Sequence, residues 1–186
     1  MAEYSLRLPL SEADARMLRA GDTVLLSGDM YTGRDAAHKR LIALLDEGKP
    51  LPMDLQGQVI YYVGPAPASP GHAVGAAGPT SSYRMDPYTP ALLRLGLRGM
   101  IGKGRRNEEV RRAMQACGAV YFGAVGGAAA LIARSIRKSE VIAYPDLGTE
   151  AIHRFTVENF PVIVLMDTQG GNLYESGPAQ YRQQLP

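Results

Sequence analysis

The segment at residues 78–86 combines a turn signal with side chains that can bind a small anion. It reads Gly-Pro-Thr-Ser-Ser-Tyr-Arg-Met-Asp, and its glycine and proline predict a turn because both are poor in helix and strand interiors. Thr80 and the two serines after it present hydroxyl groups, and Arg84 adds a guanidinium that can grip a carboxylate through two parallel hydrogen bonds. The pattern suits a small dicarboxylate ligand. It is also typical of a Ser/Thr-rich cap that leads into a helix, which needs no ligand.

A second segment, residues 27–41, follows the apolar run at residues 23–26. This order predicts a strand, a glycine-bearing turn and then a helix with Arg34 and Asp35 in its first turn. Free backbone N–H groups and the helix dipole favour a bound anion there. Asp35 can instead serve as the acidic N-terminal residue of the helix itself. His38 falls one turn after Arg34 on the same face, where a lone histidine is more often structural than functional.

The rest of the chain predicts an α/β domain, in which strands and helices alternate. Strands are expected at residues 4–8, 23–26, 58–63, 99–101, 120–122, 140–143 and 162–166, and helices at residues 11–18, 36–46, 90–95, 108–116 and 126–134. The sequence has no internal repeat, low-complexity tract or charge block that would mark a linker. Residues 1–186 are therefore expected to form a single domain.

Lys103 lies directly after the predicted strand at residues 99–101, where α/β folds tend to place ligand-contacting residues. The Gly-Lys-Gly sequence around it lacks the rest of a phosphate-binding P-loop, and the glycines at residues 123–127 are spaced differently from a dinucleotide fingerprint. Both stretches favour close approach of the backbone to a small ligand or a neighbouring subunit over nucleotide binding. The proline- and glycine-rich segment at residues 64–78 predicts a long loop that is functional or mobile.

Composition narrows the function classes. The net charge is +2, with 20 basic and 18 acidic residues interspersed, so the sequence has no basic stripe for nucleic acid. Cys117 is the single cysteine, which excludes an internal disulfide and favours a reducing compartment. No apolar run has the length of a signal peptide or a membrane span, so we expect a cytoplasmic protein that binds neither membrane nor nucleic acid. One cysteine and three histidines, without metal-ligand spacing, predict no metal site in this chain.

Six short motifs are spread along the chain in an order that can be compared with known families. They are Ser27-Gly28 with Arg34-Asp35-Ala36-Ala37-His38, Gly78-Pro79-Thr80 with Arg84-Met85-Asp86, Ile101-Gly102-Lys103-Gly104, Gly126-Gly127-Ala128-Ala129, Glu150-Ala151-Ile152 and Phe160-Pro161-Val162. Together they resemble the β subunit of the two-subunit class I iron–sulfur fumarate hydratases and the related L-tartrate dehydratases. In single-chain members of this family the same sequence forms the C-terminal domain. The resemblance implies a swivelling β/β/α domain with a mixed sheet and flanking helices.

The resemblance also implies an activity, the reversible dehydration of a 2-hydroxy dicarboxylate, either malate to fumarate or tartrate to oxaloacetate. A 4Fe–4S cluster held by the partner α subunit, and not by this chain, would supply the Lewis acid for the leaving hydroxide. Carried over residue by residue, Thr80 would be the base that takes the C3 proton. Arg34, Arg84 and Lys103 would bind the substrate carboxylates and neutralise the charge of the carbanion-like intermediate. The chain would be active only with the cluster-bearing subunit and would homodimerise or form a heterotetramer.

A threonine hydroxyl is a very weak base, so it needs an acidic partner. The resemblance implies an Asp of the α subunit, and Asp86 is an alternative within the chain. Two other functions stay open. One is a non-catalytic anion-binding or regulatory module without a cluster-bearing partner, and the other is a self-sufficient, metal-independent enzyme that uses Thr80 and Asp86.

The chain departs from the family pattern in two places. Ser81 stands where the family commonly has a second threonine, which should leave the hydrogen bonding intact. Arg105 and Arg106 stand where relatives often have smaller residues. These arginines are expected either to be solvated or to alter the edge of the pocket, and they weaken a choice between fumarate and tartrate.

Overall fold

Short apolar strands form a mixed sheet in the computed structural model, which describes residues 2–124 and 129–182. The strands are β1 (Glu3–Arg7), β2 (Thr23–Thr32), β3 (Val59–Tyr61), β4 (Gly99–Gly102), β5 (Val120–Gly123), β6 (Ile136–Ala143) and β7 (Ile152–Met166). β1 to β5 pair in sequence order and in parallel, whereas β7 runs antiparallel to β2, β5 and β6. Because β7 pairs with both β5 and β2, the pairings of β2, β3, β4, β5 and β7 close a ring.

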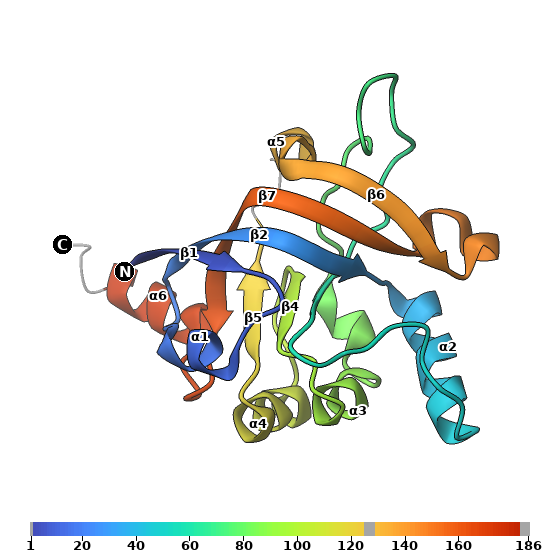
Figure 1. Ribbon diagram of the computed structural model, residues 1–186. Helices are drawn as coiled ribbons and strands as arrows, with labels where there is room; N and C mark the ends of the chain where they lie inside the picture. The colour runs from blue at the N-terminus through green and yellow to red at the C-terminus, as the bar shows by residue number, and fades with distance from the viewer. Residues whose placement is uncertain (1, 125–128, 183–186) are drawn as a thin grey trace.

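Helices connect the strands and cover the sheet. Within the described residues they are α1 (Glu12–Met17), α2 (Asp35–Asp46), α3 (Thr89–Arg94), α4 (Glu108–Cys117), α5 (Ala129–Ser135) and α6 (Leu173–Arg182), with the 3-10 helices η1 (Ser82–Met85) and η2 (Pro145–Glu150). Local sequence sets several of the ends. The Ser11 hydroxyl accepts a hydrogen bond from the Asp14 amide at the start of α1, and Gly118 ends α4 in the left-handed conformation. In the view of Figure 1, α2, α3 and α4 lie below the strands and α5 lies above them.

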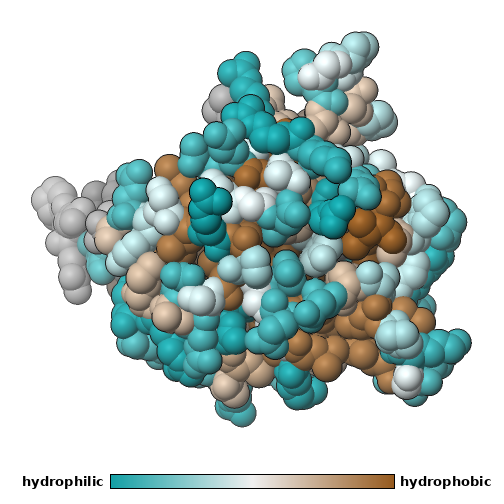
Figure 2. All heavy atoms as spheres, viewed as in Figure 1, coloured by the Kyte–Doolittle hydropathy of each residue, from teal (hydrophilic) through white to brown (hydrophobic). Residues whose placement is uncertain are grey.

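Strand side chains alternate between two apolar cores, as the pleat of a β-strand requires. Along β3, Val59 and Tyr61 enter one core with many residues of β2 and β7. Ile60 enters the other core with apolar residues of α2, α3 and α4. Figure 2 shows apolar residues reaching the surface at the lower right, where α2 lies in Figure 1, and again at the right edge above it, between areas of polar residues.

The expected α/β class, with a mixed sheet and flanking helices, is confirmed, and most predicted elements are present. The motif at residues 126–129 and the start of the helix predicted from residue 126 lie outside the described residues, and that helix is described from Ala129 onward. The helix α6 was not predicted. No helix in the part of the chain that the structure describes is long and apolar enough to cross a membrane.

Three strands are several residues longer than predicted. β6 begins at Ile136 instead of residue 140. β2 does not end at residue 26 but continues through Gly28 to Thr32. Gly28 has φ 122° and lies where the register shifts against β7, so it forms a bulge that glycine tolerates. β7 begins at Ile152 instead of residue 162 and contains Pro161. β2 and β7 extend because each supplies hydrogen bonds to the other, from the pair of Thr23 with Ile163 to the pair of Tyr31 with Arg154.

Candidate functional site

The loops that follow β2, β3 and β4 meet at one edge of the sheet, because parallel neighbouring strands end on the same side. A main-chain hydrogen bond of 3.1 Å from the Gly33 amide to the Tyr61 carbonyl keeps the ends of β2 and β3 together. The four predicted site residues all belong to these loops: Arg34 after β2, Thr80 and Arg84 after β3, and Lys103 after β4. The structure therefore brings them to one edge from distant parts of the sequence.

Main-chain hydrogen bonds fix Thr80 close to Lys103. The Thr80 amide donates to the carbonyl of Tyr62 at 2.7 Å, and the Ser82 amide donates to the carbonyl of Lys103 at 2.9 Å. Between them, Ser81 forms a parallel β-bridge with Lys103. Thr80 is half-buried and Lys103 is exposed. The loop with the hydroxyl groups and the loop with the ammonium group thus share a short extension of the sheet.

Gly102 permits this close approach of the two loops. A Cβ atom on Gly102 would overlap the Oγ atom of Ser82. Ser82 is fully buried, and its Oγ lies 2.8 Å from the hydroxyl of Tyr121, which also donates to the Gly104 carbonyl at 2.9 Å. The third hydroxyl of the loop is therefore structural, and the two before it remain half-buried at the edge of the site.

Arg84 reaches the first turn of α2 through an ion pair. Its Nη2 atom lies 2.8 Å from Oδ2 of Asp35, and the Arg84 side chain is 39% exposed. An ion pair this exposed contributes about 1 kcal/mol or less to stability, and the exposed remainder of the guanidinium stays available to a ligand carboxylate. Asp35 is thus the acidic residue of the first helical turn and also the group that orients Arg84.

Arg34 lies deeper in the same region, at the N-cap of α2. Its Nε atom is 3.2 Å from Oε1 of Glu150, and its side chain is 25% exposed. Among the described residues these two buried atoms find no partner with hydrogen-bond geometry, so the contact is an ion pair only. A Cβ on Gly64 would lie 2.9 Å from Nη1 of Arg34, so the guanidinium rests against the backbone there. The sequence had placed Glu150 in a motif without giving it a role.

His38 is fully buried behind this helix start. Its Nδ1 atom lies 2.7 Å from the carbonyl oxygen of Arg34. Because a carbonyl only accepts hydrogen bonds, Nδ1 carries the proton of the neutral ring. Burial lowers the pKa of His38 to about 4, so the side chain is neutral at physiological pH. These contacts support the structural interpretation of this histidine.

Asp86 is committed to partners inside the protein. It is 5% exposed, its Oδ1 accepts from Nε of Arg106 at 2.6 Å, and its Oδ2 accepts from the Asn107 amide at 2.8 Å. The Arg106 side chain is fully buried, so the expectation of a solvated residue is wrong for Arg106, whereas Arg105 is exposed. Burial opposes the charge of Arg106, but Tyr62 and Asp86 outweigh this effect and raise its pKa. This burial could not be predicted from the sequence, because the partners of Arg106 lie far away along the chain.

The donor set of this chain does not fit an iron–sulfur cluster. The described residues contain no group of three or more His, Cys, Asp or Glu side chains that could hold a metal ion. Clusters are held by several thiolates, and Cys117 is the single cysteine of the sequence. It ends α4, just before β5 begins. This places it at the opposite edge of the sheet from Thr80.

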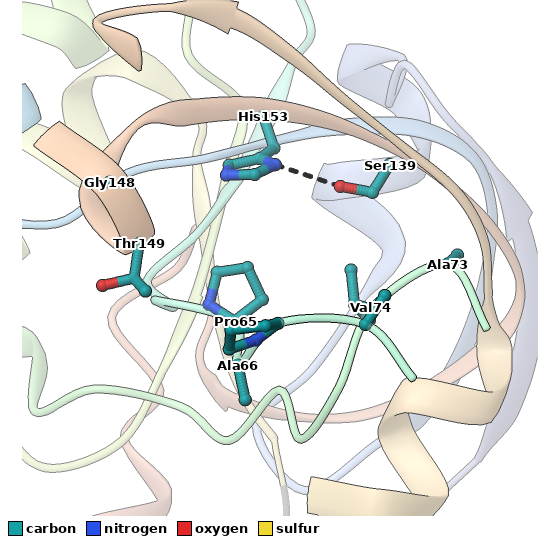
Figure 3. A pocket seen from close by; sticks show the side chains of 10 residues that line it. Pro65, Ala66, Ala73, Val74, Ser139, Gly148, Thr149 and His153 are labelled. Atoms are coloured by element: carbon teal, nitrogen blue, oxygen red, sulfur yellow. Dashed lines mark hydrogen bonds between the residues drawn. The ribbon is translucent and has the colours of Figure 1, made fainter. Parts of the chain in front are cut away.

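A separate hollow of about 200 Å³ lies beside the long loop at residues 64–78. Figure 3 shows His153 and Ser139 on one wall, with Nδ1 and Oγ 3.0 Å apart. Proline and alanine residues of the long loop line much of the rest. The lining includes none of the four predicted site residues, so the hollow is distinct from the candidate site.

The sequence matches one known protein family over most of its length. The family model described as Fumarase C-terminus matches residues 2–177. The chain belongs to the Fumarase C-terminus family. All four predicted site residues lie within the matched part.

Relatives of this Fumarase C-terminus chain fall into two groups by length. The anaerobic class I fumarate hydratase of Escherichia coli is 38% identical over 177 residues, which cover 93% of this chain and 32% of that protein. Fumarate hydratase 2 of Leishmania major is 37% identical over 92% of this chain and 31% of its own length. The chain therefore spans about a third of the fumarate hydratases that it matches. The putative L(+)-tartrate dehydratase subunit beta of Methanocaldococcus jannaschii is 36% identical over 93% of this chain and 91% of its own length.

The buried His38 predicts a loss of stability in mild acid. Its pKa is lowered from 6.5 to about 4 in the folded protein. The unfolded chain therefore takes up a proton as the pH falls through 6.5, whereas the folded chain does so only near pH 4. The contribution of the neutral ring to the free energy of unfolding is fully present above pH 6.5. It is lost as the pH falls from 6.5 to 4, which lowers the free energy of unfolding by roughly 3 kcal/mol.

The measurement is urea unfolding of wild type and His38→Gln at several pH values across this window. The variant should lose less unfolding free energy between pH 7 and 4 than wild type does. His72→Gln, at an exposed histidine, is the control and should keep the wild-type dependence. Equal pH dependence in wild type and His38→Gln would contradict the assignment.

Proposed function

We propose that this chain is the β subunit of a two-subunit iron–sulfur hydro-lyase that reversibly dehydrates a 2-hydroxy dicarboxylate, malate to fumarate or tartrate to oxaloacetate. The chain supplies the base and the carboxylate-binding residues, and an α subunit supplies the 4Fe–4S cluster. The main support is the gathering of Thr80, Arg34, Arg84 and Lys103 at one edge of a Fumarase C-terminus domain. The match to nearly the whole of a tartrate dehydratase subunit beta also supports it.

The three cations bind the carboxylates of the substrate. Arg84 keeps Nη2 on Asp35, which holds the plane of its guanidinium while the rest of the fork receives a carboxylate. Arg34 is partly buried beside Glu150, and desolvation of this kind strengthens its attraction for an anion. Lys103 is held by the backbone next to the hydroxyl loop. Together they offset the negative charge that develops when the carbon-bound proton leaves.

Thr80 takes that proton with help from a second polypeptide. A threonine hydroxyl needs an acidic group to draw its own proton away. Asp86 is held by Arg106 and Asn107, which argues against the self-sufficient enzyme that uses Thr80 and Asp86. We assign the acidic partner to the α subunit, as the family resemblance implies.

The exposure of the candidate site suits a subunit contact. Arg84 and Lys103 are exposed, and Tyr83, which lies between Ser82 and Arg84, is 67% exposed. Exposed tyrosines are enriched where protein surfaces meet. The cluster supplies Lewis acidity when the α subunit is bound, and the single cysteine of this chain agrees with a cluster held by that partner.

Thr80→Ala should separate chemistry from binding in the complex with the α subunit. If Thr80 is the base, its loss removes a group that acts in the transition state. We expect kcat to fall by roughly two orders of magnitude or more with little change in substrate affinity. Thr80→Ser should keep part of the activity, because the hydroxyl survives, and Ser81→Ala, one residue away, should be far milder.

Exchange of solvent deuterium into the C3 position of the hydroxy acid reports proton removal independently of water loss. Thr80→Ala should lose this exchange, and Ser81→Ala should retain it. Exchange at the wild-type rate in Thr80→Ala would show that the base is another residue.

The carboxylate-binding role of Arg84 is tested by replacing its planar fork with a point charge. Arg84→Lys should reduce kcat/KM of the complex by roughly 10-fold or more. Arg34→Ala and Lys103→Ala should also be severe. Arg105→Ala, at an exposed arginine of the loop that contains Lys103, is the control and should be close to wild type. Wild-type kinetics in all three site variants would rule out substrate contact by these residues.

A further inference from the structure

We infer that Arg106 is a positioning residue, which holds the loop of Thr80 and the loop of Lys103 in the arrangement that the site needs. This inference rests on the proposed function for its effect on catalysis. That Arg106 holds the two loops in place is argued from its contacts alone. Its side chain is fully buried, so it reaches the substrate only through the residues that it holds.

The guanidinium of Arg106 binds the C-terminal end of the loop at residues 78–86, which contains Thr80. Its Nε donates to Oδ1 of Asp86 at 2.6 Å, and its Nη2 donates to Oγ1 of Thr89 at 2.8 Å. The Thr89 hydroxyl in turn donates to the carbonyl of Met85 at 2.8 Å. One planar group thus anchors the end of η1 and the start of α3, which follow directly after Arg84.

The same guanidinium lies over the rings of two tyrosines. Its Cζ atom is 5.4 Å from the ring centre of Tyr62 and 5.1 Å from that of Tyr121. Nη1 also lies 3.4 Å from the Tyr62 hydroxyl. These distances are typical of cation–π contacts. Both rings are therefore fixed by the cation next to them.

The two tyrosines connect Arg106 to both sides of Thr80. The carbonyl of Tyr62 accepts the Thr80 amide at 2.7 Å. The hydroxyl of Tyr121 lies 2.8 Å from Oγ of Ser82 and 2.9 Å from the carbonyl of Gly104. A shift of Arg106 would therefore move Tyr62, which holds the Thr80 amide, and also Ser82 and Gly104, which Tyr121 holds.

Lysine cannot replace Arg106 in this arrangement. Arginine donates hydrogen bonds from several nitrogens in one plane and also stacks on aromatic rings. A lysine ammonium keeps the charge for Asp86, but it cannot at the same time donate to Thr89 and contact both tyrosine rings as the planar group does. Arg106→Lys therefore tests geometry without removing the positive charge.

Arg98 is the matched control for a buried arginine far from the site. It is 8% exposed, and its Nη1 donates to the carbonyls of Cys117 and Gly118 at 2.7 and 3.1 Å. It precedes β4, at the edge of the sheet opposite to Lys103. Arg98→Lys should cost stability without moving the loops of the site.

The first experiment measures amide hydrogen exchange of the full chain, which needs no assumption about activity. In Arg106→Lys, the amides of Thr80 and Ser82 should exchange at least 10-fold faster than in wild type, because their acceptors on Tyr62 and Lys103 are no longer held. In Arg98→Lys these two amides should keep the wild-type rate. Unchanged exchange of both amides in Arg106→Lys would overturn the inference.

The second experiment measures kcat and KM of the same variants in complex with the α subunit. A displacement of about 1 Å in a site can cost roughly 100-fold in rate, so Arg106→Lys should lower kcat to that extent, and Arg98→Lys should stay within about 3-fold of wild type. Equal kinetics of the two variants would overturn the inference. If the wild-type complex has no hydro-lyase activity, the proposed function fails, and the exchange experiment still decides the positioning of the loops.

Asp86→Asn replaces Arg106→Lys in the exchange experiment if Arg106→Lys does not fold. This variant keeps the shape of the side chain and weakens its pairing with Arg106. The same two amides should exchange faster, and wild-type protection at both would count against the inference.

Discussion

The buried pair of Arg106 and Asp86 ties together the segments from which the candidate site is built. Nε of Arg106 lies 2.6 Å from Oδ1 of Asp86, and the side chains of Arg106 and Asp86 are 0% and 6% exposed. Removing one partner of such a pair typically costs about 3–5 kcal/mol, because the other charge is left buried and unpaired. The loop at residues 78–86 therefore cannot drift away from the loop at residues 103–107 without a large loss of stability. The position of Thr80 relative to Lys103 follows from this constraint.

The parallel strands provide the second level of positioning. β2, β3 and β4 end at the same edge of the sheet, so residues as distant along the chain as Arg34 and Lys103 reach one place. Ser82 and Asp86 are buried at this edge, and their side chains make hydrogen bonds to Tyr121 and Arg106. The outer members, Arg84 and Lys103, are left at the surface. Such a division suits a site that closes only against a second subunit.

The sequence predicted which residues gather at this edge of the sheet better than it predicted what surrounds them. Thr80, Arg84 and Lys103 could be expected there because turn residues, hydroxyls and cations follow the ends of apolar strands, and these signals are local. The burial of Arg106 could not be predicted, because Asp86 is 20 residues away and Tyr62 is 44 residues away. The extension of β2 through Gly28 was missed for the same reason, since it depends on pairing with β7.

We propose that this chain supplies one part of a site and that a cluster-bearing subunit supplies the other. The most direct measurement compares hydration of fumarate, and dehydration of tartrate, by the purified chain alone and by the chain co-expressed with the α subunit under anaerobic conditions. We expect no turnover by the chain alone and turnover of at least one substrate by the complex. Turnover by the isolated, metal-free chain, or an inactive complex with an intact cluster, would contradict it.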